Sequence, residues 1–199
     1  MNLPNLITLM RLVLTAGVFV FLELAPRSSV MAQGLIGEVI EPGCIWIAFV
    51  LFLIAAVTDF LDGYLARRWN LVTAFGRVAD PFADKVLIAG SLITLLQFPA
   101  ATTVLTTWYV VIVVAREFLV TAIRGVVEAT GRPFPADRLG KWKMVSQCWT
   151  VAALITMVAG AGIWVWAAQW GFWISLGLTV VSGLNYVVKA RDVLFAGAR

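Results

Sequence analysis

The chain has 199 residues, of which 61% are hydrophobic and only 13% are charged. Because soluble domains usually carry about 25% charged residues, this composition excludes an ordinary soluble protein and favours a membrane protein, with one domain over residues 1–199. The net charge is +4 and the chain contains no histidine. This excludes imidazole bases, histidine metal ligands and a serine–histidine triad.

Six apolar segments follow one another along the chain, and each is long enough for a membrane span of about 20 residues. They cover residues 5–25, 44–66, 78–98, 104–128, 142–163 and 171–194. No cleavable signal peptide is expected, because Pro4 and Arg11 interrupt the first stretch and no small-residue cleavage site follows a short apolar core. We therefore predict an all-α integral membrane protein with six transmembrane helices.

Basic residues are distributed unequally between the connections. They gather between segments two and three, between segments four and five, and at the end of the chain: Arg67, Arg68, Arg77, Arg132, Arg138, Lys141, Lys143, Lys189, Arg191 and Arg199. The opposite connections contain only Arg27. The positive-inside rule then predicts cytoplasmic termini in the cell (inner) membrane. Such a one-sided basic face suits anionic headgroups and phosphorylated substrates better than nucleic acid.

Four aspartates lie close together in the second and third segments. Asp59 and Asp62 are three residues apart, and Asp80 and Asp84 are four apart, so each pair shares a helical face. The short connection makes these helices antiparallel neighbours, so the four carboxylates can converge. A carboxylate at the centre of a membrane helix costs about 2.5–3.5 kcal/mol. Two divalent cations, Mg²⁺ or Mn²⁺, would compensate this cost, since both take oxygen ligands.

The residues beside the aspartates are small or basic. Gly63 and Ala66 remove side-chain bulk on the adjoining face, which lets a ligand or a backbone approach. Arg67 is suited to a phosphate, and Gly76 lies one turn before Asp80. The alternative interpretation is structural: the aspartates would only form ion pairs with basic neighbours, which are Arg67, Arg77 and Lys85.

The pattern D-x₂-D-G-x₂-A-R-x₈-G-x₃-D-x₃-D resembles the signature of the CDP-alcohol phosphotransferases. It matches at every fixed position, namely Asp59, Asp62, Gly63, Ala66, Arg67, Gly76, Asp80 and Asp84. The resemblance implies six transmembrane helices, a homodimer and two divalent ions held by the aspartates. It also implies transfer of a phosphate-containing group from a CDP-linked donor to an alcohol, with release of CMP.

The same resemblance implies roles for individual residues. Asp59, Asp62 and Asp80 would bind one metal ion, and Asp59, Asp80 and Asp84 would border the second. Asp84 would also be the general base. The residues expected to border the CDP-lipid are Asn5, Thr8, Asp62, Gly63, Ala66, Arg67 and Gly76. Asn5 and Thr8 are included among these residues because they share a helical face with Arg11. The alternative is that this face serves as an interfacial anchor.

Further segments are similar to the bacterial phosphatidylglycerophosphate synthases: N-L-P-N-L-I-T-L-M-R, A-R-E-F-L-V-T-A-I-R-G, G-K-W-K-M and S-G-L-N-Y. This implies transfer of the phosphatidyl group from CDP-diacylglycerol to the primary hydroxyl of sn-glycerol 3-phosphate. Arg116 and Arg124, two turns apart on one face, and Lys141 are predicted to bind the acceptor's phosphate. The alternatives are a structural pair between Arg116 and Glu117, and a surface role for Lys143.

Three other functions remain open on the sequence. One is the same family with another acceptor, such as inositol phosphate, serine or a phospholipid. A membrane prenyltransferase also uses aspartates and Mg²⁺, but its acidic clusters should occupy two separated loops. A cation transporter would use the aspartates as an ion path and would need none of Gly63, Ala66 or Arg67.

Overall fold

The computed structural model describes residues 3–25, 43–69, 74–131 and 137–194. Inside these ranges, the side chains of residues 3–5, 60–69, 74–78, 80, 163, 193 and 194 lie outside the description. The described ranges contain only helices: α1 (Leu3–Leu24), α2 (Gly43–Trp69), α3 (Ala74–Leu95), α4 (Pro99–Thr102), α5 (Thr107–Ala129), α6 (Arg138–Val158), the 3₁₀ helix η2 (Gly162–Trp164) and α7 (Val165–Leu194).

Each predicted apolar segment corresponds to one of the six long helices, so the prediction of an all-helical chain is confirmed. The long helices contain between 21 and 30 residues. At 1.5 Å of rise per residue they are about 32–45 Å long, which matches or exceeds the hydrocarbon core of a bilayer. Their boundaries differ from the predicted segments by a few residues because several helices continue into charged turns.

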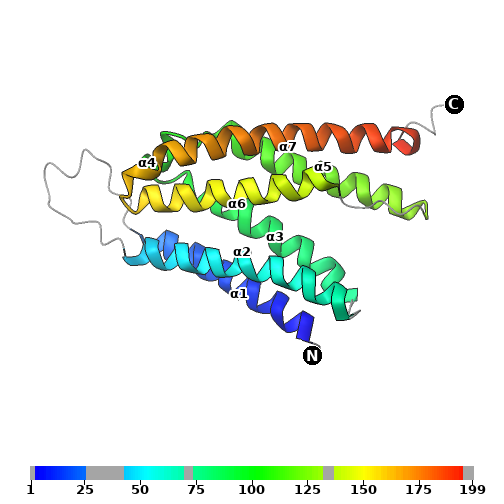
Figure 1. The fold of residues 1–199 in the computed structure, drawn as a ribbon, viewed down its shortest axis with the longest axis horizontal. Helices are drawn as coiled ribbons and strands as arrows, with labels where there is room; N and C mark the ends of the chain where they lie inside the picture. The colour runs from blue at the N-terminus through cyan, green and yellow to red at the C-terminus, as the bar shows by residue number, and fades with distance from the viewer. Residues whose placement is uncertain (1–2, 26–42, 70–73, 132–136, 195–199) are drawn as a thin grey trace, which may run out of the picture.

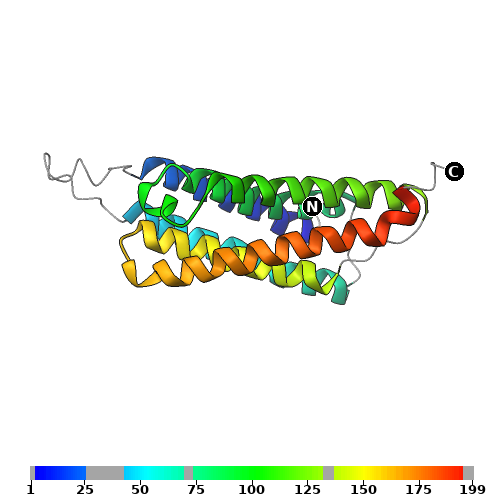
Figure 2. The ribbon, with the colours of Figure 1, turned by 90° about the horizontal axis from the view of Figure 1, so that it is seen from above.

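The long helices form two groups (Figures 1 and 2). In the first group α1 packs against α2 and α3, and in the second α7 packs against α5 and α6. Contacts of α6 with α2 and α3 join the groups. The two groups lie close together at the end that carries α4 and diverge toward the end where α1 begins and α7 ends (Figure 1).

Glycine allows the closest helix contacts. A Cβ atom at Gly90 of α3 would lie 2.2 Å from the Phe19 ring of α1, a distance that real Cβ contacts do not reach. At Gly171 of α7, a Cβ would lie 2.9 Å from Oγ1 of Thr150 on α6. Small residues at helix crossings are typical of membrane bundles, where close van der Waals packing drives association.

The apolar core occupies the α4 end of the bundle. It is built from the end of α1, the start of α2, the end of α3, the start of α5 and the end of α6, and includes Leu22, Phe52, Leu95, Tyr109 and Leu154. Toward the diverging end, the buried side chains become polar or charged, as at Arg11, Arg116 and Lys143. Most of the buried apolar packing therefore lies at the α4 end, and a small second cluster of Ile123, Val127 and Ala190 lies toward the other end.

The outer surface is strongly apolar. Large exposed side chains include Phe118, Trp142, Trp166 and Trp170. Two helices in the described part of the chain are long and apolar enough to cross a membrane, Leu6–Leu24 and Val165–Asp192. Only 28% and 39% of their apolar windows is buried, whereas the core helix of a soluble protein is mostly buried. These two helices fit membrane insertion, and six spans stay a prediction.

Candidate active site

Arg11 joins two aspartates of the acidic signature. Its Nη1 atom lies 2.5 Å from Oδ1 of Asp59 and 3.0 Å from Oδ1 of Asp84. The arginine belongs to α1 and the aspartates to α2 and α3, so the three helices meet at one guanidinium. The Arg11 side chain is only 1% exposed. A buried charge of this kind persists only when opposite charges surround it, which explains why the carboxylates lie side by side.

The face of α1 that carries Arg11 points into the bundle along its length. Thr8 and Thr15 lie one turn before and one turn after Arg11, and both are almost completely buried. Thr15 donates a hydrogen bond to the Arg11 carbonyl oxygen, which satisfies its hydroxyl inside the helix. The predicted face that contains Thr8 and Arg11 therefore faces the acidic pair.

Several predicted site residues belong to described helices although their side chains are not described. Asp62, Gly63, Ala66 and Arg67 lie on α2, Gly76 and Asp80 lie on α3, and Asn5 lies on α1. Asp62 follows Asp59 by one turn, and Asp80 precedes Asp84 by one turn. Among the described side chains no group of three metal ligands occurs. The described pair, Asp59 and Asp84, supplies the hard oxygen donors that suit Mg²⁺ or Mn²⁺.

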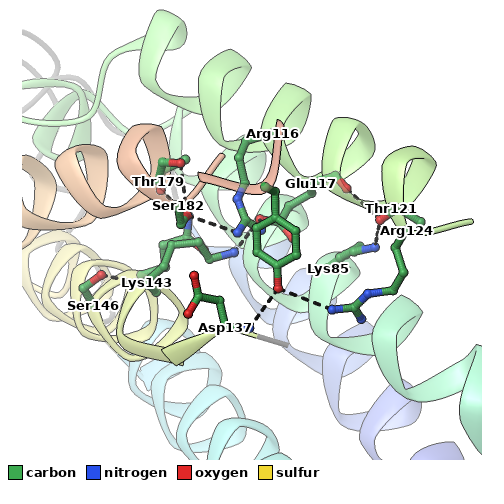
Figure 3. Close-up of polar contacts among 12 residues, drawn as sticks. Lys85, Arg116, Glu117, Thr121, Arg124, Asp137, Lys143, Ser146, Thr179 and Ser182 are labelled. Atoms are coloured by element: carbon green, nitrogen blue, oxygen red, sulfur yellow. Dashed lines mark hydrogen bonds and ion pairs between the residues drawn. The ribbon is translucent and has the colours of Figure 1, made fainter. Parts of the chain in front are cut away.

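Figure 3 shows a basic cluster, defined as Lys85, Arg116, Arg124 and Lys143, whose members come from α3, α5 and α6. Glu117 contacts two of its members. Its Oε1 lies 3.0 Å from Nη1 of Arg116 and also accepts a hydrogen bond from Lys143. Arg116 Nη2 donates a second bond to Oγ of Ser182 at 3.1 Å. The pair between Arg116 and Glu117, which the sequence left as an alternative, is thus present.

The other two members of the basic cluster have neutral partners. Lys85 donates to the hydroxyl of Thr121, and Arg124 lies 3.5 Å from the hydroxyl of Tyr186. Among the described residues, neither forms an ion pair. The buried Nε atoms of Arg116 and Arg124 have no hydrogen-bond partner in the described part of the chain. The cluster therefore has positive charge and N–H donors in excess, the properties of an anion site.

The acidic pair and the basic cluster are neighbours. Asp84 and Lys85 are consecutive on α3, and Lys85 reaches α5 through Thr121. Cys148 on α6 lies near Asp59, Asp84 and Lys143, so these three charges lie around one position of α6. A substrate with two separated phosphate groups could therefore meet the carboxylates and the cations together.

Two lysines at the start of α6 lie in different surroundings. Lys141, the predicted phosphate ligand, is exposed, whereas Lys143 is buried against Glu117. Helical spacing could have identified Lys143, because it begins a stripe of polar residues with Gln147 and Thr150, all of which are buried. Lys141 does not share that stripe. Sequence reasoning also missed that Arg11 contacts the aspartates and that Tyr186 contacts Arg124.

Comparison with known proteins finds a family and relatives that match nearly the whole chain. The CDP-alcohol phosphatidyltransferase family matches residues 1–181. A protein of Bacillus subtilis named CDP-diacylglycerol–glycerol-3-phosphate 3-phosphatidyltransferase is 38% identical over 194 residues, covering 97% of each chain.

Proteins with the same name occur in Pseudomonas fluorescens and Salmonella choleraesuis. The first is 34% identical, covering 96% of this chain and 90% of the relative, and the second is 32% identical, covering 97% of each. The family predicted from the acidic signature is confirmed. The chain belongs to the CDP-alcohol phosphatidyltransferase family.

Proposed function

We propose that this chain transfers the phosphatidyl group of CDP-diacylglycerol to the primary hydroxyl of sn-glycerol 3-phosphate. The products are phosphatidylglycerol phosphate and CMP, so the enzyme acts in phospholipid biosynthesis. The names of relatives that match almost the entire chain support this reaction. The observation that carries the proposal is the basic cluster beside the Asp59–Asp84 pair, because an acceptor with its own phosphate needs such a cationic site.

The family generally uses divalent metal ions. In this chain Asp59, Asp62, Asp80 and Asp84 would hold two of them, Mg²⁺ or Mn²⁺. Bound there, the ions would neutralise the diphosphate and stabilise the negative charge on departing CMP. The donor would lie along α1 to α3, against these residues: Asn5, Thr8, Asp62, Gly63, Ala66, Arg67 and Gly76.

The acceptor would lie between the acidic pair and the basic cluster. Arg116, Arg124 and Lys141 are proposed to bind its phosphate, and the position of Lys143 adds a fourth candidate. Asp84 would accept the proton of the attacking hydroxyl as the new oxygen–phosphorus bond forms and the bond to CMP breaks. Glu117 would hold the side chains of Arg116 and Lys143 in place, while the buried Nε of Arg116 has no hydrogen-bond partner among the described residues.

In the proposed membrane arrangement, residues 1–199 form one domain with six spans in the cell (inner) membrane. Both termini and the active site face the cytoplasm, where glycerol 3-phosphate is available. The lengths of the long helices, and the position of the α1 start and the α7 end at one end of the bundle (Figure 1), support this arrangement. The acyl chains of the donor would remain in the bilayer, and a homodimer is proposed from the family resemblance.

A panel of acceptors tests the reaction directly. The purified protein, supplied with CDP-diacylglycerol and Mg²⁺ or Mn²⁺, should release CMP rapidly with glycerol 3-phosphate. Release of CMP with glycerol, serine, inositol phosphate or phosphatidylglycerol should be slower by about two orders of magnitude. Glycerol and serine have no phosphate to pair with the buried cationic side chains, and the phosphate groups of the other two acceptors would fit the site poorly. Equal rates with glycerol or serine would contradict the proposed acceptor.

Arg124→Ala should raise the KM for glycerol 3-phosphate by about tenfold and leave the KM for CDP-diacylglycerol nearly unchanged. Arg124→Lys should restore acceptor binding only in part, because an ammonium group cannot make a two-pronged contact with phosphate. Steady-state CMP release at varied concentrations of each substrate measures both constants. Arg191→Ala is the control, since the Arg191 side chain is 69% exposed and its ion pair is with its sequence neighbour Asp192. A parallel rise in both KM values would remove Arg124 from acceptor recognition.

A further inference from the structure

The segment S-G-L-N-Y, residues 182–186 of α7, lies against both arginines of the basic cluster. Ser182 accepts a hydrogen bond from Nη2 of Arg116 at 3.1 Å. A Cβ atom at Gly183 would lie 3.2 Å from Cγ of Arg116, so the arginine stem passes directly over the α7 backbone at this glycine. The position of Arg116 is therefore defined along its length by α7.

Tyr186 contacts both arginines at once. Its ring centroid lies 5.7 Å from Cζ of Arg116, within the range of a cation–π interaction. Its hydroxyl oxygen lies 3.5 Å from Nη2 of Arg124. The side chain is only 3% exposed, so its ring cannot turn away into solvent. One buried tyrosine therefore connects the two guanidinium groups that are proposed to bind the acceptor's phosphate.

The hydroxyl of Tyr186 is itself held in place. It accepts a hydrogen bond from the backbone N–H of Asp137 at 3.0 Å and lies 3.5 Å from Nη2 of Arg124. The carboxylate of Asp137 accepts hydrogen bonds from Asn185 and from Lys189, the latter at 3.0 Å. The Lys189 hydrogen bond, together with its positive charge, lowers the pKa of Asp137, so the carboxylate is charged at neutral pH.

Asp137 lies immediately before α6, so these bonds also attach the start of α6 to α7. A flexible arginine loses considerable rotamer entropy when its guanidinium group is fixed on a phosphate. Contacts that orient the guanidinium beforehand remove part of that cost. From this arrangement we infer that Tyr186 is a positioning residue for the acceptor: its ring orients Arg116 and its hydroxyl orients Arg124. This inference rests on the proposed function, because it assigns the acceptor's phosphate to these arginines.

Tyr186→Phe removes only the hydroxyl and keeps the ring under Arg116. It should raise the KM for glycerol 3-phosphate by about three- to tenfold, the equivalent of one hydrogen bond to a charged partner. Tyr186→Leu removes the ring as well and should raise this KM further. In both variants the KM for CDP-diacylglycerol and kcat at saturation should stay within about twofold of wild type, since ground-state positioning acts on acceptor binding.

Tyr109→Phe is the matched control. Tyr109 is also a buried tyrosine, and its hydroxyl bonds Ser175 of α7 at 2.7 Å. It lies in the apolar core at the α4 end, two helical turns before Arg116 on α5, and its hydroxyl bonds no member of the basic cluster among the described residues. The substitution removes an equivalent α5–α7 hydrogen bond, so it should lower the melting temperature without changing the KM for glycerol 3-phosphate. If Tyr109→Phe changes the KM for glycerol 3-phosphate as much as Tyr186→Phe does, the loss of stability alone explains both changes. That result would overturn the inference.

A double-variant cycle separates this inference from the proposed function. If the hydroxyl acts through Arg124, Tyr186→Phe should have little further effect on the acceptor KM when Arg124→Ala is already present. If Arg124→Ala raises the acceptor KM but neither Tyr186 variant does, the positioning role is wrong and the proposed acceptor site survives. If Arg124→Ala itself leaves the acceptor KM unchanged, the proposed site fails, and the inference fails with it.

Discussion

Asp59→Asn should lower the rate of CMP release by about a thousandfold while the folded protein remains in the membrane. The asparagine side chain keeps an oxygen that can accept the hydrogen bond from Arg11, so α1 and α2 stay joined. It cannot supply the negative charge that a divalent cation requires. CMP release at saturating concentrations of both substrates measures the loss, and the melting temperature verifies folding.

Two companion variants sharpen this prediction. Asp80→Asn, which removes a proposed ligand of both metal ions, should give a loss of the same order. Asp192→Asn should keep the wild-type rate, because the Asp192 side chain is 80% exposed and lies at the end of α7. Near-normal CMP release by well-folded Asp59→Asn would mean that this carboxylate has a structural role only.

Arg11→Met should destabilise the protein strongly when divalent cations are absent. The variant leaves Asp59 and Asp84 beside each other without the guanidinium that neutralises them. Breaking a buried ion pair from one side costs about 3–5 kcal/mol, and the lower end of this range applies because the two carboxylates are partly exposed. Methionine has a similar unbranched stem, so most of the packing around residue 11 should be kept.

Adding Mn²⁺ or Mg²⁺ should restore part of the lost stability, since a divalent cation can replace the missing positive charge. The measurement is the melting temperature with a chelator and with each metal, compared between Arg11→Met and wild type. The increase caused by the metal should be larger in the variant. Arg191→Met, at an exposed position, should behave like wild type. A variant that is equally unstable with and without metal would show that Arg11 acts through packing alone.

The number and type of the long helices could be predicted from the sequence because both depend on local properties, whereas the short α4 and η2 were not predicted. A run of about 20 apolar residues must satisfy its backbone hydrogen bonds internally in a bilayer, and only a helix does so within one segment. The spacing of Asp59, Asp62, Asp80 and Asp84 is likewise local, since each pair lies within a single helix. The family resemblance depended on this spacing, and the comparisons confirmed the family.

The contacts between the helices were decided by the tertiary structure. Periodicity indicates which residues share a face, but it does not indicate which helix that face meets. The sequence predicts that the helical face of Arg11 meets the CDP-lipid or the membrane surface, and the structure places Arg11 against Asp84, 73 residues away. Lys143 rather than Lys141 contacts Glu117 for the same reason, because the rotation of α6 against α5 decides which lysine turns inward.

The S-G-L-N-Y segment depends on both the sequence and the tertiary structure. The sequence by itself determined that these residues lie on a long C-terminal helix, and it identified the segment through its resemblance to relatives. Only the packing of α7 against α5 and α6 determined that Ser182 and Tyr186 meet Arg116, and that Tyr186 also meets Arg124 and Asp137. These partners lie 49 to 70 residues away along the chain, and at such separations only the folded bundle brings side chains into contact.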